Sequence, residues 1–177
     1  MNRAALEHIL RAAAAITNHR EFVVIGSQAI LGQYPQAPDS LLASSEADVY
    51  PLHAPGRSDL VDGAIGELSL FHQTFGYYAH GVDDTTATLP AGWAERLVRI
   101  ENENTGGAVG WCLEAHDLAI SKLVAGRERD AAFLLVLLRE GMVDAVVLAD
   151  RLDALPLAAD RIERLRLQLH RLVAASR

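Results

Sequence analysis

Cysteine and lysine each occur once in the 177 residues, as Cys112 and Lys122, and aromatic residues make up only 6% of the chain. A single cysteine cannot form a disulfide within the chain, so we expect a reducing, cytoplasmic setting. The scarcity of aromatic rings argues against a surface that stacks the bases of single-stranded RNA. The sequence has neither a run of about 18 apolar residues nor the layout of a signal peptide, so we expect no membrane association.

Several well-known site motifs are also missing. The sequence has no Gly-x-Ser-x-Gly turn, no Walker A loop and no Gly-x-Gly-x-x-Gly turn. These absences argue against an α/β-hydrolase, a P-loop protein and a dinucleotide-binding fold. The histidines lack metal-site spacing such as His-x-x-x-His, so His53, His72, His80 and His116 are expected to be structural. Among them, His80 is the one that could line a pocket.

The charge is divided unevenly along the chain, whose formal net charge is −7 at pH 7. Residues 1–150 hold 10 basic and 20 acidic side chains, whereas residues 151–177 hold 6 basic and 3 acidic ones. An acidic body does not attract nucleic acid non-specifically, so any contact with RNA is expected to be local. The basic end is either the solvated face of an amphipathic helix or a phosphate contact made by Arg161, Arg164, Arg166 and Arg171.

Hydrophobic periodicity predicts strands and helices first, then helices alone. Strands are expected at 22–25, 47–52, 77–82, 85–89, 97–101 and 109–113. Helices are expected at 3–18, from 28–31, at 57–73, and then at 115–125, 128–140, 143–153 and 159–175. This order predicts an α+β fold, in which helices flank a small mixed sheet. We expect residues 1–113 to form this core and residues 114–177 to form a helical subdomain packed on it.

Two short motifs have the chemistry to hold a phosphate and a metal ion. Gly26 lets the backbone turn directly after the strand at 22–25, and the Ser27 hydroxyl and nearby backbone N–H groups can bind a phosphate oxygen. Glu46 and Asp48 are two residues apart on a strand, so they point to the same face. Two such carboxylates repel each other unless a cation lies between them, and Mg²⁺ favours carboxylates together with substrate phosphates. Each motif alone also fits a simple turn or a pair of solvated acids.

A third group of charged residues occurs between 117 and 130. Asp117 begins a predicted helix, and it is either its N-cap or a functional acid. Lys122 follows on the same helix, and its ammonium group could pair with the phosphates of a nucleoside triphosphate. Arg127 and Asp130 lie on or beside the next helix, and their simpler interpretation is an ion pair between helices.

In this order, the three groups resemble the nucleotidyltransferase superfamily of the DNA polymerase β type. The match consists of Val24-Ile25-Gly26-Ser27, then Glu46-Ala47-Asp48-Val49, then the helix that carries Lys122. The stretch from Leu113 through Arg127 and Asp130 looks like the lysine helix of AbiEii-type nucleotidyltransferase toxins. The segments 92–98 and 104–111 are similar to an uncharacterised bacterial branch of the superfamily.

The resemblance implies transfer of a nucleoside monophosphate from an NTP to an acceptor hydroxyl, with release of pyrophosphate. It assigns the triphosphate to Gly26, Ser27, Lys122 and Arg127, and it assigns Mg²⁺ to Glu46 and Asp48. Asp130 matches an acid that is functional in the toxin-like members. The same members modify tRNA ends, so the resemblance implies an RNA acceptor, and it makes an antitoxin protein a possible partner.

The sequence departs from the superfamily pattern in two ways. The usual acidic pair is Asp-x-Asp, whereas the first acid here is Glu46. The third carboxylate is not obvious, and the two positions open to it are Glu101, at the end of a predicted strand, and Asp117. These departures leave a second hypothesis open, in which the chain is a catalytically inactive nucleotidyltransferase fold that binds nucleotide or regulates a partner. A third hypothesis is a structural protein whose helical tail docks another chain.

Overall fold

The structure, a computed structural model, describes residues 1–176. Contacts between residues divide the chain into two compact units. The first unit contains Met1–Thr86 and Leu97–Glu114, and the second contains Ala87–Arg96 and the chain from Ala115 onward. The sequence predicted a single boundary between 113 and 114, whereas residues 87–96 also belong to the second unit.

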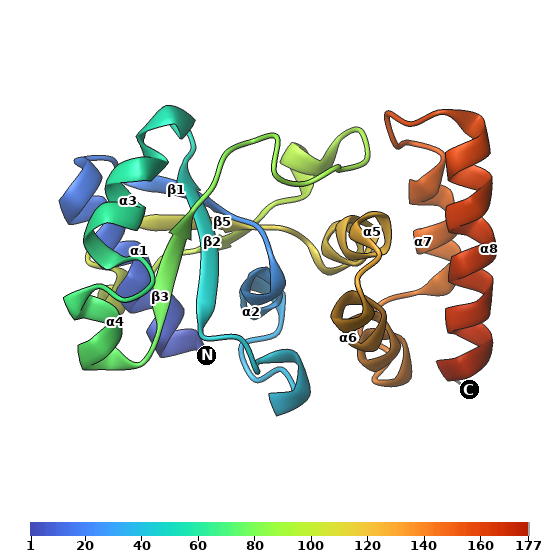
Figure 1. Cartoon of the computed structure of the whole chain (residues 1–177), viewed down its shortest axis with the longest axis horizontal. Helices are drawn as coiled ribbons and strands as arrows, with labels where there is room; N and C mark the ends of the chain where they lie inside the picture. The colour runs from blue at the N-terminus through green and yellow to red at the C-terminus, as the bar shows by residue number, and fades with distance from the viewer. Residues whose placement is uncertain (177) are drawn as a thin grey trace. The chain divides into compact units, whose positions relative to one another are not determined.

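The first unit is built on a five-stranded mixed sheet with the strand order β3-β2-β1-β5-β4. Figure 1 labels β1, β2, β3 and β5 of this sheet. Its strands are β1 (Glu21–Val24), β2 (Glu46–Pro51), β3 (Tyr78–Gly81), β4 (Val98–Ile100) and β5 (Val109–Cys112). The pairs β1/β2 and β4/β5 are antiparallel, whereas β1/β5 and β2/β3 are parallel. This sheet confirms the predicted α+β class.

Helices of the first unit pack on one face of this sheet. The unit contains α1 (Arg3–Thr17), α2 (Ile30–Gln33), α3 (Ser58–Ile65) and α4 (Leu70–Phe75), with short 3-10 turns at η1 (Ser27–Ala29), η2 (Asp39–Leu41), η3 (Pro55–Arg57) and η5 (Glu103–Thr105). Leu10 of α1 lies against Gly110 of β5, and Ser58 of α3 lies against Gly81 of β3. Gly110 and Gly81 belong to the same face, because the register aligns them with Phe22 and Val49 across the sheet. Side chains that alternate with these point to the opposite face.

Helix α1 is fixed at both ends and along its length. The Asn2 side chain accepts a hydrogen bond from the backbone of Ala5 at the start of the helix, and Asn18 ends it in the left-handed conformation. The buried Glu7 carboxylate accepts hydrogen bonds from the side chains of Asn102 at 2.7 Å and Asn104 at 3.0 Å, so it joins α1 to η5. A charged acceptor with several donors holds this loop strongly.

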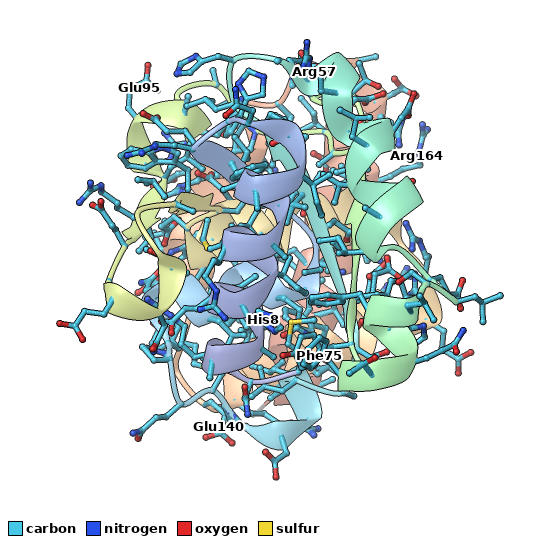
Figure 2. All side chains as sticks on the ribbon, turned by 90° about the vertical axis from the view of Figure 1, so that its left-hand side faces the viewer. His8, Arg57, Phe75, Glu95, Glu140 and Arg164 are labelled. Atoms are coloured by element: carbon cyan, nitrogen blue, oxygen red, sulfur yellow. The ribbon has the colours of Figure 1, made fainter. Side chains whose placement is uncertain are left out.

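Aromatic rings hold α4 against α1. The His8 ring lies 4.6 Å from the Phe75 ring in an edge-on arrangement, and the two residues lie close together in Figure 2. His8 also contacts Phe71, and its Nδ1 atom is 2.8 Å from the Tyr77 hydroxyl. Edge-to-face contacts between rings stabilise the fold by more than the burial of their apolar surface alone.

The second unit contains four longer helices and one 3-10 turn. The helices are α5 (Ala115–Ala125), α6 (Glu128–Arg139), α7 (Ala145–Leu152) and α8 (Ala159–Ser176), and the turn is η4 (Trp93–Arg96). Helix α5 packs against α6, α7 and α8. The buried apolar side chains include Leu118, Leu134, Leu148, Leu165 and Leu169, one stripe from each helix. The four predicted helices are therefore confirmed within one to two residues at each end.

Two predicted elements are wrong. The helix expected at 57–73 is broken into α3 and α4, because Gly66 is extended and Leu68 has a positive φ of 63°. Ser69 then begins α4, and its side chain accepts from the backbone of His72. The strand expected at 85–89 is absent from the described residues, since the Asp83 carboxylate accepts from the backbone of Thr85 and turns the chain there. None of the helices within residues 1–176 is long and apolar enough to cross a bilayer.

Candidate functional site

Two neighbouring strands bring four polar side chains to one face of the sheet. In the parallel pairing of β2 with β3, Glu46 is aligned with Tyr78 and Asp48 with His80. The two acids are two residues apart on β2, and Tyr78 and His80 are two residues apart on β3. All four side chains therefore point to the same face of the sheet, opposite the face covered by α1 and α3. The strand register alone therefore places an imidazole and a phenol beside the two predicted metal-binding acids.

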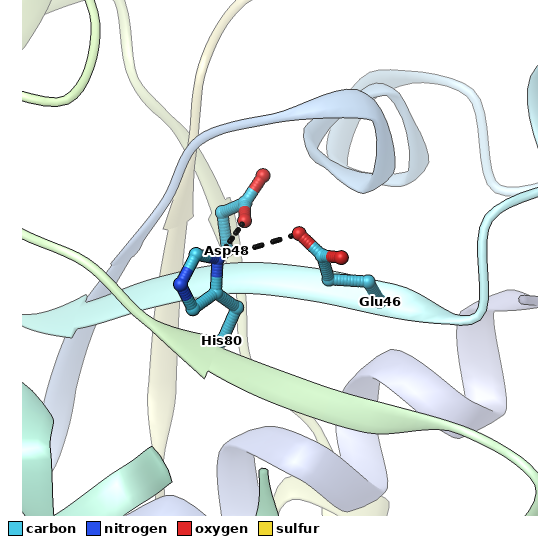
Figure 3. Close-up of side chains that lie close together, drawn as sticks. All are labelled: Glu46, Asp48 and His80. Carbon is cyan, nitrogen blue, oxygen red and sulfur yellow. Dashed lines mark hydrogen bonds and ion pairs between the residues drawn. The ribbon is translucent and has the colours of Figure 1, made fainter. Parts of the chain in front are cut away.

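The contacts within this group are short. His80 Nδ1 lies 3.2 Å from an oxygen of Asp48 and 3.4 Å from an oxygen of Glu46, and Figure 3 shows its ring directed at both carboxylates. The Tyr78 hydroxyl donates to the other oxygen of Glu46 at 3.0 Å. One ligand atom each from Glu46, Asp48 and His80 lies within 4.8 Å of the others, which is close enough for the three to share one metal ion.

The electrostatics of the group show that its negative charge is poorly solvated. Burial, together with the neighbouring Glu46 carboxylate, raises the pKa of Asp48 to about 6. Burial alone would also raise the pKa of Glu46, but hydrogen bonds from Asp48, Tyr78 and His80 together hold that pKa below its usual value. The pKa of His80 is raised because the hydrogen bond to Asp48 and the nearby acids outweigh the effect of burial. The group thus favours a positive charge, or a proton, between its two carboxylates.

The Gly26 turn lies directly against this group. Its φ is +62°, and a Cβ atom at this position would lie 1.9 Å from Asp48 Oδ2. Only glycine therefore allows the backbone after β1 to pass so close to the carboxylate. Gln28, two residues later, is fully buried, and its Nε2 donates to the Ser44 carbonyl at 3.1 Å just before β2. This hydrogen bond ties the turn to the strand that carries the acids.

The donor set suits a divalent cation. Two carboxylates, one imidazole and a close backbone turn offer oxygen and nitrogen ligands, and they leave room for no side chain at Gly26. Carboxylates are ligands of Mg²⁺ and Mn²⁺, and imidazole is a ligand of transition metals. Glu46 and Asp48, which the sequence predicted as metal ligands, are together in this group. The sequence analysis expected His80 to be structural and raised it only as a residue that could line a pocket, and it did not indicate Tyr78 or Gln28. These contributions depend on register and tertiary contacts.

The structure places neither candidate for the third carboxylate in this group. Glu101 follows β4, the strand at the opposite edge of the sheet from β3, and it forms an ion pair with Arg99. Asp117 is fully buried in the second unit, where its carboxylate binds Arg96 at 2.8 Å and Arg151 at 2.5 Å. The third member of the group, His80, offers a nitrogen atom instead of a carboxylate oxygen.

Ser27 begins η1 directly after Gly26 in the first unit, and the other remaining predicted residues lie in the second unit. The Lys122 ammonium group on α5 is 3.3 Å from the buried Asp130 carboxylate on α6, and it also lies over the Phe133 ring. Asp130 caps the start of α6 by accepting from the backbone of Arg127, and its carboxylate is 3.6 Å from the Arg127 guanidinium. The ion pair between helices is therefore present. It holds Lys122 in one place, and the roles of Lys122, Arg127 and Asp130 toward a nucleotide stay predictions.

Comparison with known protein families gives a match over most of the chain. Residues 4–172 match the model of a family described as "Nucleotidyltransferase of unknown function (DUF6036)". No curated protein and no solved structure was found to match the chain. The matched region includes the Gly26 turn, the two acids, His80 and the helix of Lys122. The chain belongs to this nucleotidyltransferase family.

Proposed function

We propose that this protein is a divalent-cation-dependent enzyme that moves a nucleoside monophosphate from an NTP to an acceptor hydroxyl. The observation that carries the proposal is the pair Glu46 and Asp48, which β2 holds beside each other against the Gly26 turn. Membership of a nucleotidyltransferase family supports the reaction class. The resemblance to the polymerase β type makes Mg²⁺ the first ion to test.

The residues have separate roles in this proposal. Glu46 and Asp48 hold the cation, and Gly26 and Ser27 bind the triphosphate through backbone N–H groups and a hydroxyl. A bound cation supplies positive charge that neutralises the phosphates and activates the incoming hydroxyl. Lys122 and Arg127 are assigned to the triphosphate by the resemblance alone, and Asp130 is assigned to hold Lys122 in place.

We further propose RNA, and tRNA in particular, as the acceptor, with an antitoxin protein as a partner. Both suggestions rest on the resemblance of the helix of Lys122 to AbiEii-type toxins. The body of the chain is acidic, so the contact with RNA is expected to be local, through the site and exposed arginines of α8. The opposite signs of charge on residues 1–150 and 151–177 support such a restricted contact.

A transfer assay tests the proposal. The purified protein is mixed with Mg²⁺ or Mn²⁺, each α-labelled NTP in turn, and total cellular RNA and protein. We expect label on one class of macromolecule with the wild type and with Asp59→Asn, which changes an exposed acid outside the site. Asp48→Asn should lower the transfer by at least about 100-fold, because the cation loses one of its two carboxylates.

Two other outcomes have different meanings. Transfer that continues in Asp48→Asn would show that the acidic pair does not carry the reaction. Tight binding of an NTP without any transfer would favour the alternative function, a nucleotide-binding or regulatory module. The presence of His80 in place of a third carboxylate is the observation that favours this alternative.

A further inference from the structure

The geometry points to His80 as a direct ligand of the cation, which makes this site selective for Mn²⁺ over Mg²⁺. This inference rests on the proposed function, since it concerns the same cation site. It assigns to His80 a role that the acids alone do not provide, and it predicts that the site binds Mn²⁺ more tightly than Mg²⁺.

The position of His80 supports a role as ligand. Its Nδ1 atom is almost equally distant from Asp48 and Glu46, at 3.2 Å and 3.4 Å, so one nitrogen faces both carboxylates (Figure 3). A cation held by these two carboxylates would meet that nitrogen before any other atom of the imidazole. The ring is presented by β3, which is paired in register with β2, so a regular element of the sheet sets its position.

The surroundings of His80 leave its ring able to coordinate. Its side chain is about half exposed, at 50%, whereas that of Asp48 is 23% exposed. A histidine that served only to fill the core would be buried, and one that served only to balance surface charge would not need to face two carboxylates at once. The Tyr78 hydroxyl already binds the second oxygen of Glu46, so the remaining oxygen of Glu46 is the one turned to His80.

The ligand chemistry determines the ion. Mg²⁺ is a hard cation that takes oxygen ligands and retains several waters. Imidazole nitrogen is a softer donor that suits first-row transition metals, whereas carboxylate oxygens suit Mg²⁺ and Mn²⁺ alike. A site with two carboxylates and one imidazole therefore disfavours Mg²⁺ relative to Mn²⁺, which accepts both donor types. A site with three carboxylates would show no such preference from its ligands.

The test measures metal binding directly and does not depend on turnover. Calorimetric titration with Mn²⁺ and with Mg²⁺ gives the affinity ratio, and electron spin-echo spectroscopy of the Mn²⁺ complex detects a coordinated ¹⁴N nucleus. We expect a nitrogen signal and a preference for Mn²⁺ in the wild type. In His80→Asp, which replaces the nitrogen with oxygen, the signal should vanish and the Mn²⁺/Mg²⁺ affinity ratio should fall by about tenfold.

A matched control is His53→Asp, because His53 is 73% exposed and faces a different acid, Glu21, at 3.9 Å. This variant should keep both the nitrogen signal and the affinity ratio. A nitrogen signal that persists in His80→Asp, or an unchanged ratio, would overturn the inference. If the wild type binds Mn²⁺ without a nitrogen signal and Glu46→Gln abolishes binding, the inference fails while the acidic site of the proposed function stands. Absence of binding by either ion, with and without ATP, would overturn both.

Discussion

Asp48 lies in a position where its negative charge is unfavourable. The carboxylate is mostly buried and is next to Glu46, and burial together with this neighbour raises its pKa to about 6. Its unfolded-state pKa is near 3.8. The folded protein therefore binds this proton more tightly than the unfolded chain does, and the free energy of unfolding falls as the pH rises from about 4 to about 6.

Because the ionised Asp48 carboxylate destabilises the folded state, its replacement should stabilise the protein at neutral pH. Asp48→Asn removes the charge and keeps the side-chain volume, so at pH 7.5 in the presence of EDTA the variant should be more stable than the wild type by up to about 3 kcal/mol. At pH 4 the two proteins should be equally stable, because Asp48 is then protonated in the folded wild type. Chemical denaturation at the two pH values measures the difference.

Addition of Mn²⁺ or Mg²⁺ should reverse the order at pH 7.5. The cation stabilises the wild type by binding the folded state, and it should leave Asp48→Asn almost unchanged. Asp59→Asn is the matched control, and it should follow the wild type under every condition. A variant at Asp48 that is less stable than the wild type at both pH values would show that the carboxylate supports the sheet instead of straining it.

The sequence could predict some of these site residues and not others. Glu46 and Asp48 are two apart on a strand, so strand geometry alone places them on one face. Gly26 was predicted from its place after a strand, although no local pattern indicates its closeness to Asp48. His80 lies 32 residues after Asp48, and its pairing depends on the parallel register that follows α3 and α4. No local pattern encodes that register.

The segment 87–96 shows how a long-range contact can override local sequence. Arg96 donates to both oxygens of the buried Asp117, and its Nη2 also binds the Ala91 carbonyl at 3.1 Å. Arg151 from α7 completes the group. Two guanidinium groups thus balance one buried carboxylate, which fixes the loop within the second unit. Removal of a partner from such a group leaves charge uncompensated, so its loss is strongly destabilising.

A second prediction concerns this loop. Asp117→Asn should lower the free energy of unfolding by about 3 to 5 kcal/mol, because it removes the negative charge that Arg96 and Arg151 share. Hydrogen exchange, measured by mass spectrometry under native conditions, should speed up in 87–96 more than in the helices of the same unit. The reason is that Arg96 binds the Ala91 carbonyl, and Ala91 in turn donates to the Ala154 carbonyl, so the backbone of this loop depends on the Asp117 group.

Asp160→Asn is the control for this prediction. Asp160 forms an i,i+4 pair with Arg164, and both side chains are more than 60% exposed, at 67% and 68%. Exposed ion pairs of this kind contribute little to stability. The free energy of unfolding and the hydrogen exchange in 87–96 should therefore stay within error of the wild type. Equal effects of the two substitutions would mean that the buried group at Asp117 does not hold the loop.

Helices and strands that are determined by the hydrophobic pattern of their own residues were predicted well. The amphipathic helices α1 and α8 and the apolar strand β1 lie within about two residues of the predicted ranges. The two wrong predictions depend on tertiary contacts or on the conformation of a single residue. The break between α3 and α4 depends on the left-handed Leu68, which bonds to the His72 ring through its backbone N–H. The strand predicted at 85–89 does not form in the described residues, because Asp83 turns the chain at Thr85 and residues 87–96 belong to a loop that Arg96 ties to Asp117. Nothing within 85–89 reveals this tie.

Across the whole chain, charge limits where a nucleic acid can bind. The net charge of −7 repels a phosphate backbone, and the positive excess is confined to residues 151–177. Within α8, Arg164 pairs with Asp160, and Arg166 pairs with Asp153 at 2.6 Å. Arg161 and Arg171 are exposed. These two side chains are therefore the arginines of α8 best able to bind phosphate without first breaking an ion pair described in this structure.

The last prediction concerns these two arginines and tRNA. Each phosphate contact releases counterions, so binding weakens as salt rises, with a slope set by the number of contacts. The double variant Arg161→Ser/Arg171→Ser should bind every tRNA more weakly, whatever its nucleotide sequence. It should also reduce the slope of log affinity against log salt by about 2. Fluorescence anisotropy with labelled tRNA at several salt concentrations measures both quantities.

The control variant must change the net charge by the same amount. Arg20→Ser/Arg57→Ser does so in the first unit, where both arginines are exposed. If the contact is local, this variant should keep the wild-type slope, although its affinity falls slightly with the net charge. If the slope of log affinity against log salt falls equally in both double variants, tRNA is attracted by the overall charge, and α8 has no special role. If neither variant changes the slope, the acceptor reaches the site without α8, and the basic face of this helix is a solvated surface.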